Sequence, residues 1–90
     1  MKVIKIGAVW CNGCLVMRPR WAEIERENPW LKTEYLDFDN DHELVSKYKV
    51  ESGKLPVFIF LNKKGGEILR ISGEIEKIDL LKAINESKNL

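Results

Sequence analysis

The chain has 90 residues, 44% of them hydrophobic and 32% charged, with a formal net charge of +1. We expect one soluble globular domain, residues 1–90, because this length suits a single core and the composition is not that of a disordered chain. The balanced charge and the lack of an apolar run near the roughly 20 residues that span a bilayer give no reason to expect a nucleic-acid or membrane partner.

The beginning of the chain, MKVIKIGAVW, only weakly resembles a secretory signal. Lys5 interrupts its apolar stretch and no small-residue cleavage site follows, so we take the start as mature protein. We therefore expect a cytoplasmic protein. In that compartment a pair of cysteines is more often catalytic or metal-binding than structural.

A strand and a helix are predicted to open the chain. Residues 2–9 are rich in β-branched side chains and lead to a Cys-Asn-Gly stretch, which favours a strand. A helix should follow over residues 12–27, because apolar residues recur at helical spacing and an Asn-Pro pair stops it. Its expected inner stripe is Leu15, Val16, Trp21 and Ile24.

A second strand and a short helix come next. TEYLDF, residues 33–38, has the alternating character of a strand. Asp39 or Asn40 is expected to cap a short helix that runs to about Tyr48. The side chains expected to face inward are Leu44, Val45 and Tyr48.

The last part of the chain predicts a hairpin and a helix. VFIFL, residues 57–61, is continuously apolar, as expected of a strand buried on both faces. The NKKGG turn leads into a strand over 67–72 that pairs back. After Gly73, residues 74–88 predict an amphipathic helix. Its expected inner stripe is Ile75, Ile78, Leu80, Leu81 and Ile84.

The predicted element order is therefore β-α-β-α-β-β-α. The first β-α-β unit requires parallel strands and a right-handed crossover, and the last two strands form an antiparallel hairpin. Helices on both faces of a four-stranded mixed sheet would cover every apolar stripe, so we expect an α/β fold of this kind.

The two cysteines, Cys11 and Cys14, stand three positions apart where the first strand meets the first helix. A structural zinc site needs further ligands, but the chain has no third cysteine and only one histidine, His42. A structural disulfide that closes so short a loop removes little chain entropy. We therefore expect no metal and favour redox chemistry, with zinc and a structural disulfide as the lesser alternatives.

The start of a helix favours different roles for the two thiols. The first free N–H groups of the helix favour a thiolate at Cys11, which we expect to be the exposed nucleophile. Cys14 lies on the same face and can attack a mixed disulfide at Cys11, so we expect it to be the shielded resolving thiol.

These residues resemble the active site of the thioredoxin family, in which a strand leads into a WCxxC motif that opens a helix. Here the motif spans Trp10 to Cys14 and is followed by Pro19. The resemblance covers nearly all of the chain through YLDFDND, the Leu55-Pro56 pair, VFIFL and Gly73. It implies a minimal thioredoxin fold, without the family's usual first strand and helix and close in size to glutaredoxins.

The resemblance also implies a substrate groove. In the family, the proline that matches Pro56 follows a cis peptide bond and lies beside the cysteines. The backbone of the preceding residue, here Leu55, can then pair with an extended substrate peptide. The groove residues implied in this way are Trp10, Asn12, Gly13, Leu55, Pro56 and Gly73.

The chain departs from the family pattern near the cysteines. Asn12-Gly13 replaces the usual Gly-Pro pair, so a reducing potential like that of the family does not carry over. Lys5 stands where thioredoxins have a buried acidic residue that moves protons. It either extends to solvent or lies within ~6 Å of the cysteines and tunes their pKa values. Tyr35, on the neighbouring strand, stands where the family often has a lysine.

We therefore predict a protein thiol–disulfide oxidoreductase that uses Cys11 and Cys14 and no further cofactor. Its partners would be protein disulfides and a separate reductase, either a flavin-dependent thioredoxin reductase or the glutathione system, and we expect a monomer. Two alternatives stay open: a glutaredoxin-like enzyme that depends on glutathione, and a redox-sensing or binding module whose cysteine pair gates a protein partner or holds a metal between subunits.

Overall fold

The computed structural model describes residues 1–90 and contains the predicted element order. Its elements are β1 Lys2–Gly7, α1 Asn12–Glu27, β2 Lys32–Asp37, α2 His42–Lys47, the 3-10 turn η1 Ser52–Lys54, β3 Val57–Leu61, β4 Glu67–Ser72 and α3 Lys77–Ser87. The four strands form one sheet in the order β2-β1-β3-β4. β1 is parallel to β2, and β3 is antiparallel to both of its neighbours, so the predicted mixed sheet is confirmed.

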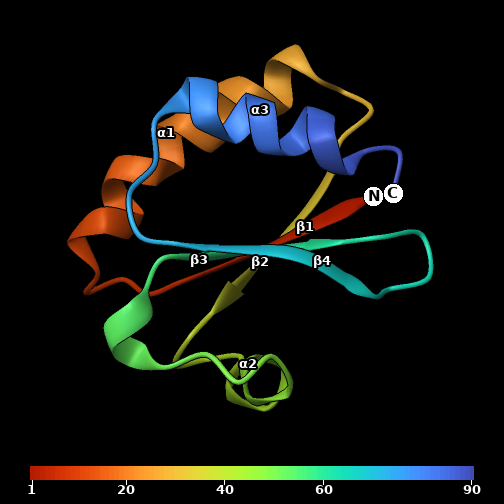
Figure 1. Cartoon of the computed structure of the whole chain (residues 1–90). Helices are drawn as coiled ribbons and strands as arrows, with labels where there is room; N and C mark the ends of the chain where they lie inside the picture. Colours follow the sequence, from red (N-terminus) through yellow and green to blue (C-terminus); the bar gives the residue numbers. More distant parts are fainter.

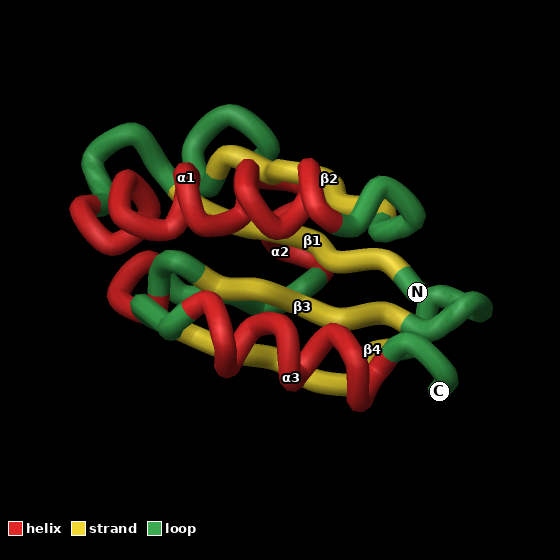
Figure 2. The backbone as a smooth tube through the Cα atoms, turned by 90° about the horizontal axis from the view of Figure 1, so that it is seen from above, coloured by secondary structure: helices red, strands yellow, loops and turns green.

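Helices cover both faces of this sheet. α1 and α3 lie on one face and α2 lies on the other (Figure 1). Seen from above, α1 runs along β1 and β2, whereas α3 runs along β3 and β4 (Figure 2). None of the three α-helices combines the length and the apolar character that crossing a membrane would need.

Two buried clusters hold these layers together. One lies on each face of the sheet, because successive side chains of a strand point to opposite faces. The cluster under α1 and α3 consists of Val3, Met17, Trp21, Ile24, Leu31, Phe58, Phe60, Leu80, Ala83 and Ile84. The cluster under α2 consists of Ile4, Ile6, Leu36, Val45, Val57, Ile59 and Leu61. β1 and β3 contribute to both clusters; β1 ends just before the two cysteines, and β3 begins just after Pro56.

The helices present partly different faces to the sheet from those predicted. In α1, Leu15 and Val16 are exposed, and Met17 joins Trp21 and Ile24 in the core instead. These three buried residues stand four and three positions apart, which keeps them on one side of a helix with 3.6 residues per turn. In α2, Leu44 is likewise exposed rather than inward-facing.

The predicted stripe of α3 was wrong at Ile78, which is 75% exposed. Its buried residues are Leu80, Ala83, Ile84 and Ser87. A repeat of three residues drifts around a helix of 3.6 residues per turn, whereas these positions stay on one face.

This difference within α3 gives a direct test of the packing. We expect Leu80→Ala to lower the free energy of unfolding by ~2–5 kcal/mol, because Leu80 is completely buried and its truncation leaves a cavity. Ile78→Ala, the matched control, should change it by no more than ~0.5 kcal/mol. Urea unfolding of both variants measures these values. Equal losses, or a larger loss for Ile78, would contradict the observed helix face.

Candidate active site

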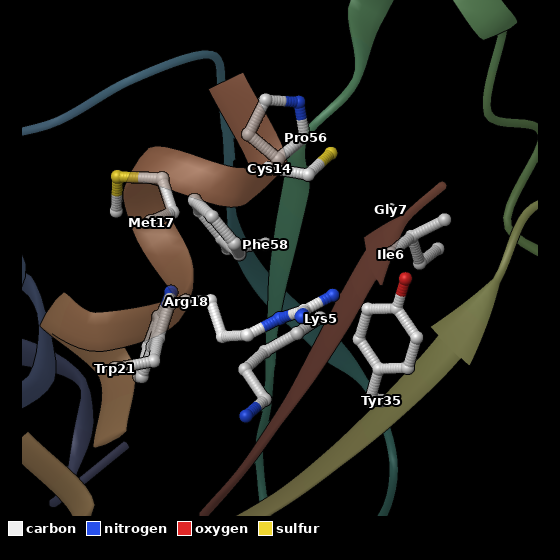
Figure 3. Close-up of a pocket in the computed structure, with 10 residues that line it drawn as sticks. All are labelled: Lys5, Ile6, Gly7, Cys14, Met17, Arg18, Trp21, Tyr35, Pro56 and Phe58. Carbon is white, nitrogen blue, oxygen red and sulfur yellow. The ribbon is translucent and has the colours of Figure 1, made fainter. Parts of the chain in front are cut away.

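The turn from β1 into α1 places the cysteine pair over the end of the sheet. β1 ends at Gly7, and α1 begins only five positions later, so the first turn of the helix returns directly above the strand end. A Cβ atom added to Gly7 would lie 3.0 Å from the sulfur of Cys14. Figure 3 shows Cys14 and Gly7 at the same end of a small pocket between α1 and the sheet.

Cys11 is the N-cap residue of α1. Its sulfur accepts a hydrogen bond from the backbone N–H of Cys14 at 3.2 Å, and its carbonyl accepts one from Leu15 N–H at 3.3 Å. The first turn contains no acidic residue that would oppose a negative charge on the sulfur. The local structure therefore favours a thiolate at Cys11 when the pair is reduced, as predicted for a cysteine at a helix start.

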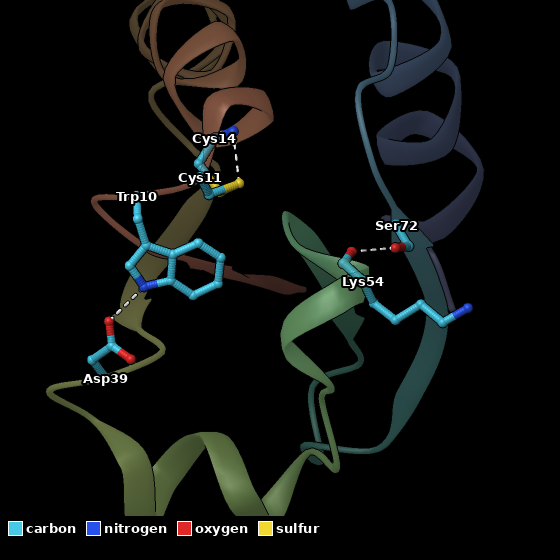
Figure 4. The surroundings of a disulfide bond; sticks show 6 residues. All are labelled: Trp10, Cys11, Cys14, Asp39, Lys54 and Ser72. Carbon is cyan, nitrogen blue, oxygen red and sulfur yellow. Dashed lines mark hydrogen bonds between the residues drawn. A yellow bond between two sulfur atoms is a disulfide. The ribbon is translucent and has the colours of Figure 1, made fainter.

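Cys11 and Cys14 form a disulfide, with 5.3 Å between their Cα atoms (Figure 4). No third cysteine exists to compete for either partner. No group of three or more His, Cys, Asp or Glu side chains is arranged to hold a metal ion.

The exposure expected of the two cysteines is reversed in this oxidised form. Cys11 is buried, with 7% of its surface exposed, whereas Cys14 is half-buried. The reason is the N-cap position, which folds the Cys11 side chain back against the first turn of the helix. The roles of nucleophile and resolving thiol stay predictions.

Pro56 closes the site from the side of β3. The Leu55–Pro56 peptide bond is cis, as the family resemblance implies. A Cβ added to Gly13 would lie 3.1 Å from Pro56 Cδ, so the proline ring lies directly against the turn between the cysteines. Gly73 adopts a φ of 93°, which favours glycine, and its N–H donates to the carbonyl of Pro56 at 2.7 Å.

The other predicted groove residues surround this centre. Asn12 is exposed at the first position of α1, and Leu55 is half-buried, with its N–H in a long 3.5 Å bond to the Ser52 carbonyl. Trp10 is 53% exposed. Its indole N–H donates to the carboxylate of Asp39 at 2.8 Å (Figure 4). The sequence pattern predicted Asp39 only as a possible helix cap, but the N-cap of α2 is Asp41, and the contact of Asp39 with Trp10 joins residues 29 positions apart.

Lys5 does not extend to solvent, as one prediction for it held, and its role in tuning the cysteines stays a prediction. Its ammonium group pairs with Glu25 of α1 at 2.5 Å and lies 5.7 Å from the centre of the Trp21 ring. The side chain is only 17% exposed, so it does not extend freely into solvent. In Figure 3 its nitrogen points away from Cys14, and the charge of Glu25 offsets that of Lys5.

Arg18 and Tyr35 lie on the same pocket as Cys14, which their sequence positions did not indicate. Both line the pocket that reaches Cys14, together with Gly7 and Pro56. Partial burial, reinforced by the nearby charge of Asp37, raises the pKa of the Tyr35 hydroxyl above its ordinary value of 10.0. A signal for Arg18 was available in the sequence, since it follows Cys14 by four positions on a predicted helix.

A disulfide at a helix N-terminus, beside a cis proline and at the end of a central strand, defines a class of dithiol proteins. The chain belongs to the thioredoxin family, whose model, described as "Thioredoxin", matches residues 1–78.

Known thioredoxins are similar to this chain in sequence and in structure. Thioredoxin C-3 of Corynebacterium nephridii is 30% identical over 78 residues, which are 87% of this chain and 52% of that protein. Thioredoxin H-type of Fagopyrum esculentum is 35% identical over 71 residues, which are 79% of this chain and 59% of that protein. The chain thus spans little more than half the length of either relative. The X-ray structure of Fasciola hepatica thioredoxin matches with a TM-score of 0.86 and 30% identity, covering 97% of this chain and 80% of that one.

The geometry of the helix start predicts an unusually reactive Cys11. We expect alkylation of a Cys14→Ser variant to reach half its maximal rate at or below about pH 7.5, because the N–H at position 14 and the helix dipole stabilise the thiolate. Mass spectrometry after timed exposure to iodoacetamide measures this midpoint. A midpoint near the ~8.5 of a free cysteine would show that the helix start does not activate Cys11.

Proposed function

We propose that this chain is a protein thiol–disulfide oxidoreductase that exchanges electrons through Cys11 and Cys14. The observation that carries the proposal is the hydrogen bond from Cys14 N–H to the Cys11 sulfur, within a pair that closes into a disulfide. Such a pair can accept two electrons and return them, and the family membership of residues 1–78 supports the same chemistry.

The reaction begins with the thiolate of Cys11. It attacks one sulfur of a substrate disulfide, forms a mixed disulfide, and releases the other substrate sulfur as a thiolate. Cys14 then attacks the Cys11 sulfur, which forms the Cys11–Cys14 bond and releases the second substrate thiolate. The released thiolates take up protons from solvent. The substrate is thereby reduced by two electrons, and the chain is oxidised by two.

The surroundings of the cysteines favour a protein as the substrate. Three apolar side chains near the pair are exposed, Val9 at 74%, Trp10 at 53% and Leu15 at 51%. Exposed apolar side chains gathered at one place are typical of a protein-binding surface. Trp10 is held in position by Asp39, so this part of the surface is partly ordered before a substrate binds.

A separate reductase would return the chain to its dithiol form. We propose a flavin-dependent thioredoxin reductase as this partner, with the glutathione system as the alternative. Turnover measured in parallel with a thioredoxin reductase plus NADPH and with glutathione plus glutathione reductase distinguishes the two. Faster turnover with the glutathione system would overturn our choice of reductase.

Single-cysteine variants test the proposed mechanism. With insulin as the model disulfide substrate, we expect Cys14→Ser to accumulate a covalent complex through Cys11, because the resolving thiol is absent. Cys11→Ser should form no such complex, and neither variant should reduce insulin catalytically. Non-reducing gel electrophoresis and an insulin turbidity assay give the two readouts. Undiminished reduction by either variant would contradict the mechanism.

A further inference from the structure

A small cavity adjoins Cys14 between α1 and the sheet (Figure 3). Its volume is about 70 Å³, and its wall includes Lys5, Cys14, Arg18 and Tyr35 but no aspartate or glutamate. This volume is large enough to hold water. Cys14 therefore shares this wall with the Tyr35 hydroxyl and with Arg18, and no carboxylate on it is available to take the Cys14 proton.

Gly7 allows Cys14 and Tyr35 to approach each other. A Cβ added to Gly7 would lie 3.0 Å from the Cys14 sulfur and 3.3 Å from the Tyr35 hydroxyl oxygen. The sulfur and the hydroxyl thus border the same small space at Gly7, one from α1 and the other from β2. In Figure 3 the Tyr35 hydroxyl is directed toward Gly7, and any larger residue at position 7 would enter the space between the two groups.

Tyr35 is suited to donate a hydrogen bond. Its partial burial raises its pKa, as do the charges of Asp37 and Asp41, while Arg18 lowers it. The hydroxyl carries its proton at neutral pH, because even the ordinary pKa of 10.0 lies well above that pH. A thiolate is a strong acceptor and a disulfide sulfur a weak one, so the hydrogen bond becomes favourable when the pair is reduced.

Arg18 is the cation best placed to act on Cys14. It stands four positions after Cys14 on α1, a spacing that brings side chains together on a helix. Arg18 has no ion pair or hydrogen bond with any other side chain, whereas Lys5 is paired with Glu25. The carboxylate of Glu74 lies on the Gly13 side of the cysteine turn, 3.6 Å from where a Gly13 Cβ would be.

From this geometry we propose that Tyr35 and Arg18 are positioning residues that stabilise Cys14 as a thiolate in the resolving step. Tyr35 donates a hydrogen bond to the sulfur, directly or through water in the cavity, and Arg18 supplies positive charge. The inference rests on the proposed function and deepens it, because it assigns the step in which both residues act.

The resolving step begins at the Cys14 thiol. The Cys14 thiol loses its proton to solvent through the cavity, and Tyr35 and Arg18 stabilise the remaining thiolate. The thiolate attacks the Cys11 sulfur, the Cys11–Cys14 bond forms, and the bond between Cys11 and the substrate sulfur breaks. The electron pair leaves with the substrate sulfur, which is protonated by solvent.

Alkylation of Cys14 in a Cys11→Ser background tests the inference without any substrate protein. We expect Tyr35→Phe to raise the midpoint pH of iodoacetamide alkylation by about one pH unit, since it removes a charge-assisted hydrogen bond. Arg18→Gln should raise it by about half a unit, and 1 M salt should reduce that second effect through screening.

Matched controls separate this effect from general changes in charge or packing. Tyr48→Phe removes a hydroxyl from the α2 side of the sheet, and Arg26→Gln removes the same charge as Arg18→Gln but near the end of α1. Neither control should move the midpoint. Unchanged midpoints in Tyr35→Phe and Arg18→Gln, or equal shifts in the controls, would overturn the inference.

A second measurement follows the resolving step itself. The reduced chain with Cys11 and Cys14 intact is mixed with 5,5′-dithiobis(2-nitrobenzoate), and release of the second thionitrobenzoate reports attack by Cys14. Tyr35→Phe should slow this phase several-fold at pH 7 and leave it unchanged at high pH, where the thiol is ionised in any case. A slowing that is equal at all pH values would overturn the role of Tyr35. Because neither measurement needs a protein substrate, failure of the proposed function and failure of this inference are distinguishable.

Discussion

The structure depends on the way in which α1 begins directly above the end of β1. The hydrogen bond from Cys14 N–H to the Cys11 sulfur, at 3.2 Å, closes this turn and holds the N-terminus of α1 above the end of the inner strand β1. Because β1 and β2 are parallel, α1 must also serve as the crossover between them. One short turn therefore places the two cysteines at the N-terminus of α1 and directs the helix back toward β2.

The remaining elements give the cysteine pair two different sides. On one side, Pro56 lies against Gly13, and Gly73 N–H holds the Pro56 carbonyl at 2.7 Å. On the other side, the cavity between α1 and the sheet brings Tyr35 and Arg18 toward Cys14. We propose that the first side binds an extended peptide and that the second controls the Cys14 proton, which would assign substrate binding and thiol ionisation to different residues.

Much of the fold and of the active site could be predicted from the sequence because the signals are local. β-Branched runs, VFIFL and the WCxxC motif each lie within a few consecutive residues. The partners across the fold could not be predicted in this way. Lys5 pairs with Glu25, 20 positions away, and Cys14 and Tyr35 both lie against Gly7 from two different elements. The Lys5–Glu25 pair and the position of Cys14 over Gly7 depend on how α1 is rotated and placed on the sheet, which helical periodicity determines only approximately.

The central claim is that Cys11 and Cys14 are a redox couple and not a structural staple. The most direct test is the reduction potential of the pair, measured by alkylating the chain after equilibration in dithiothreitol or glutathione buffers of known potential. Because the helix start stabilises the Cys11 thiolate of the reduced form, we predict a reversible two-electron transition above about −300 mV. A disulfide that stays oxidised below that potential would behave as a structural bond and would contradict the account.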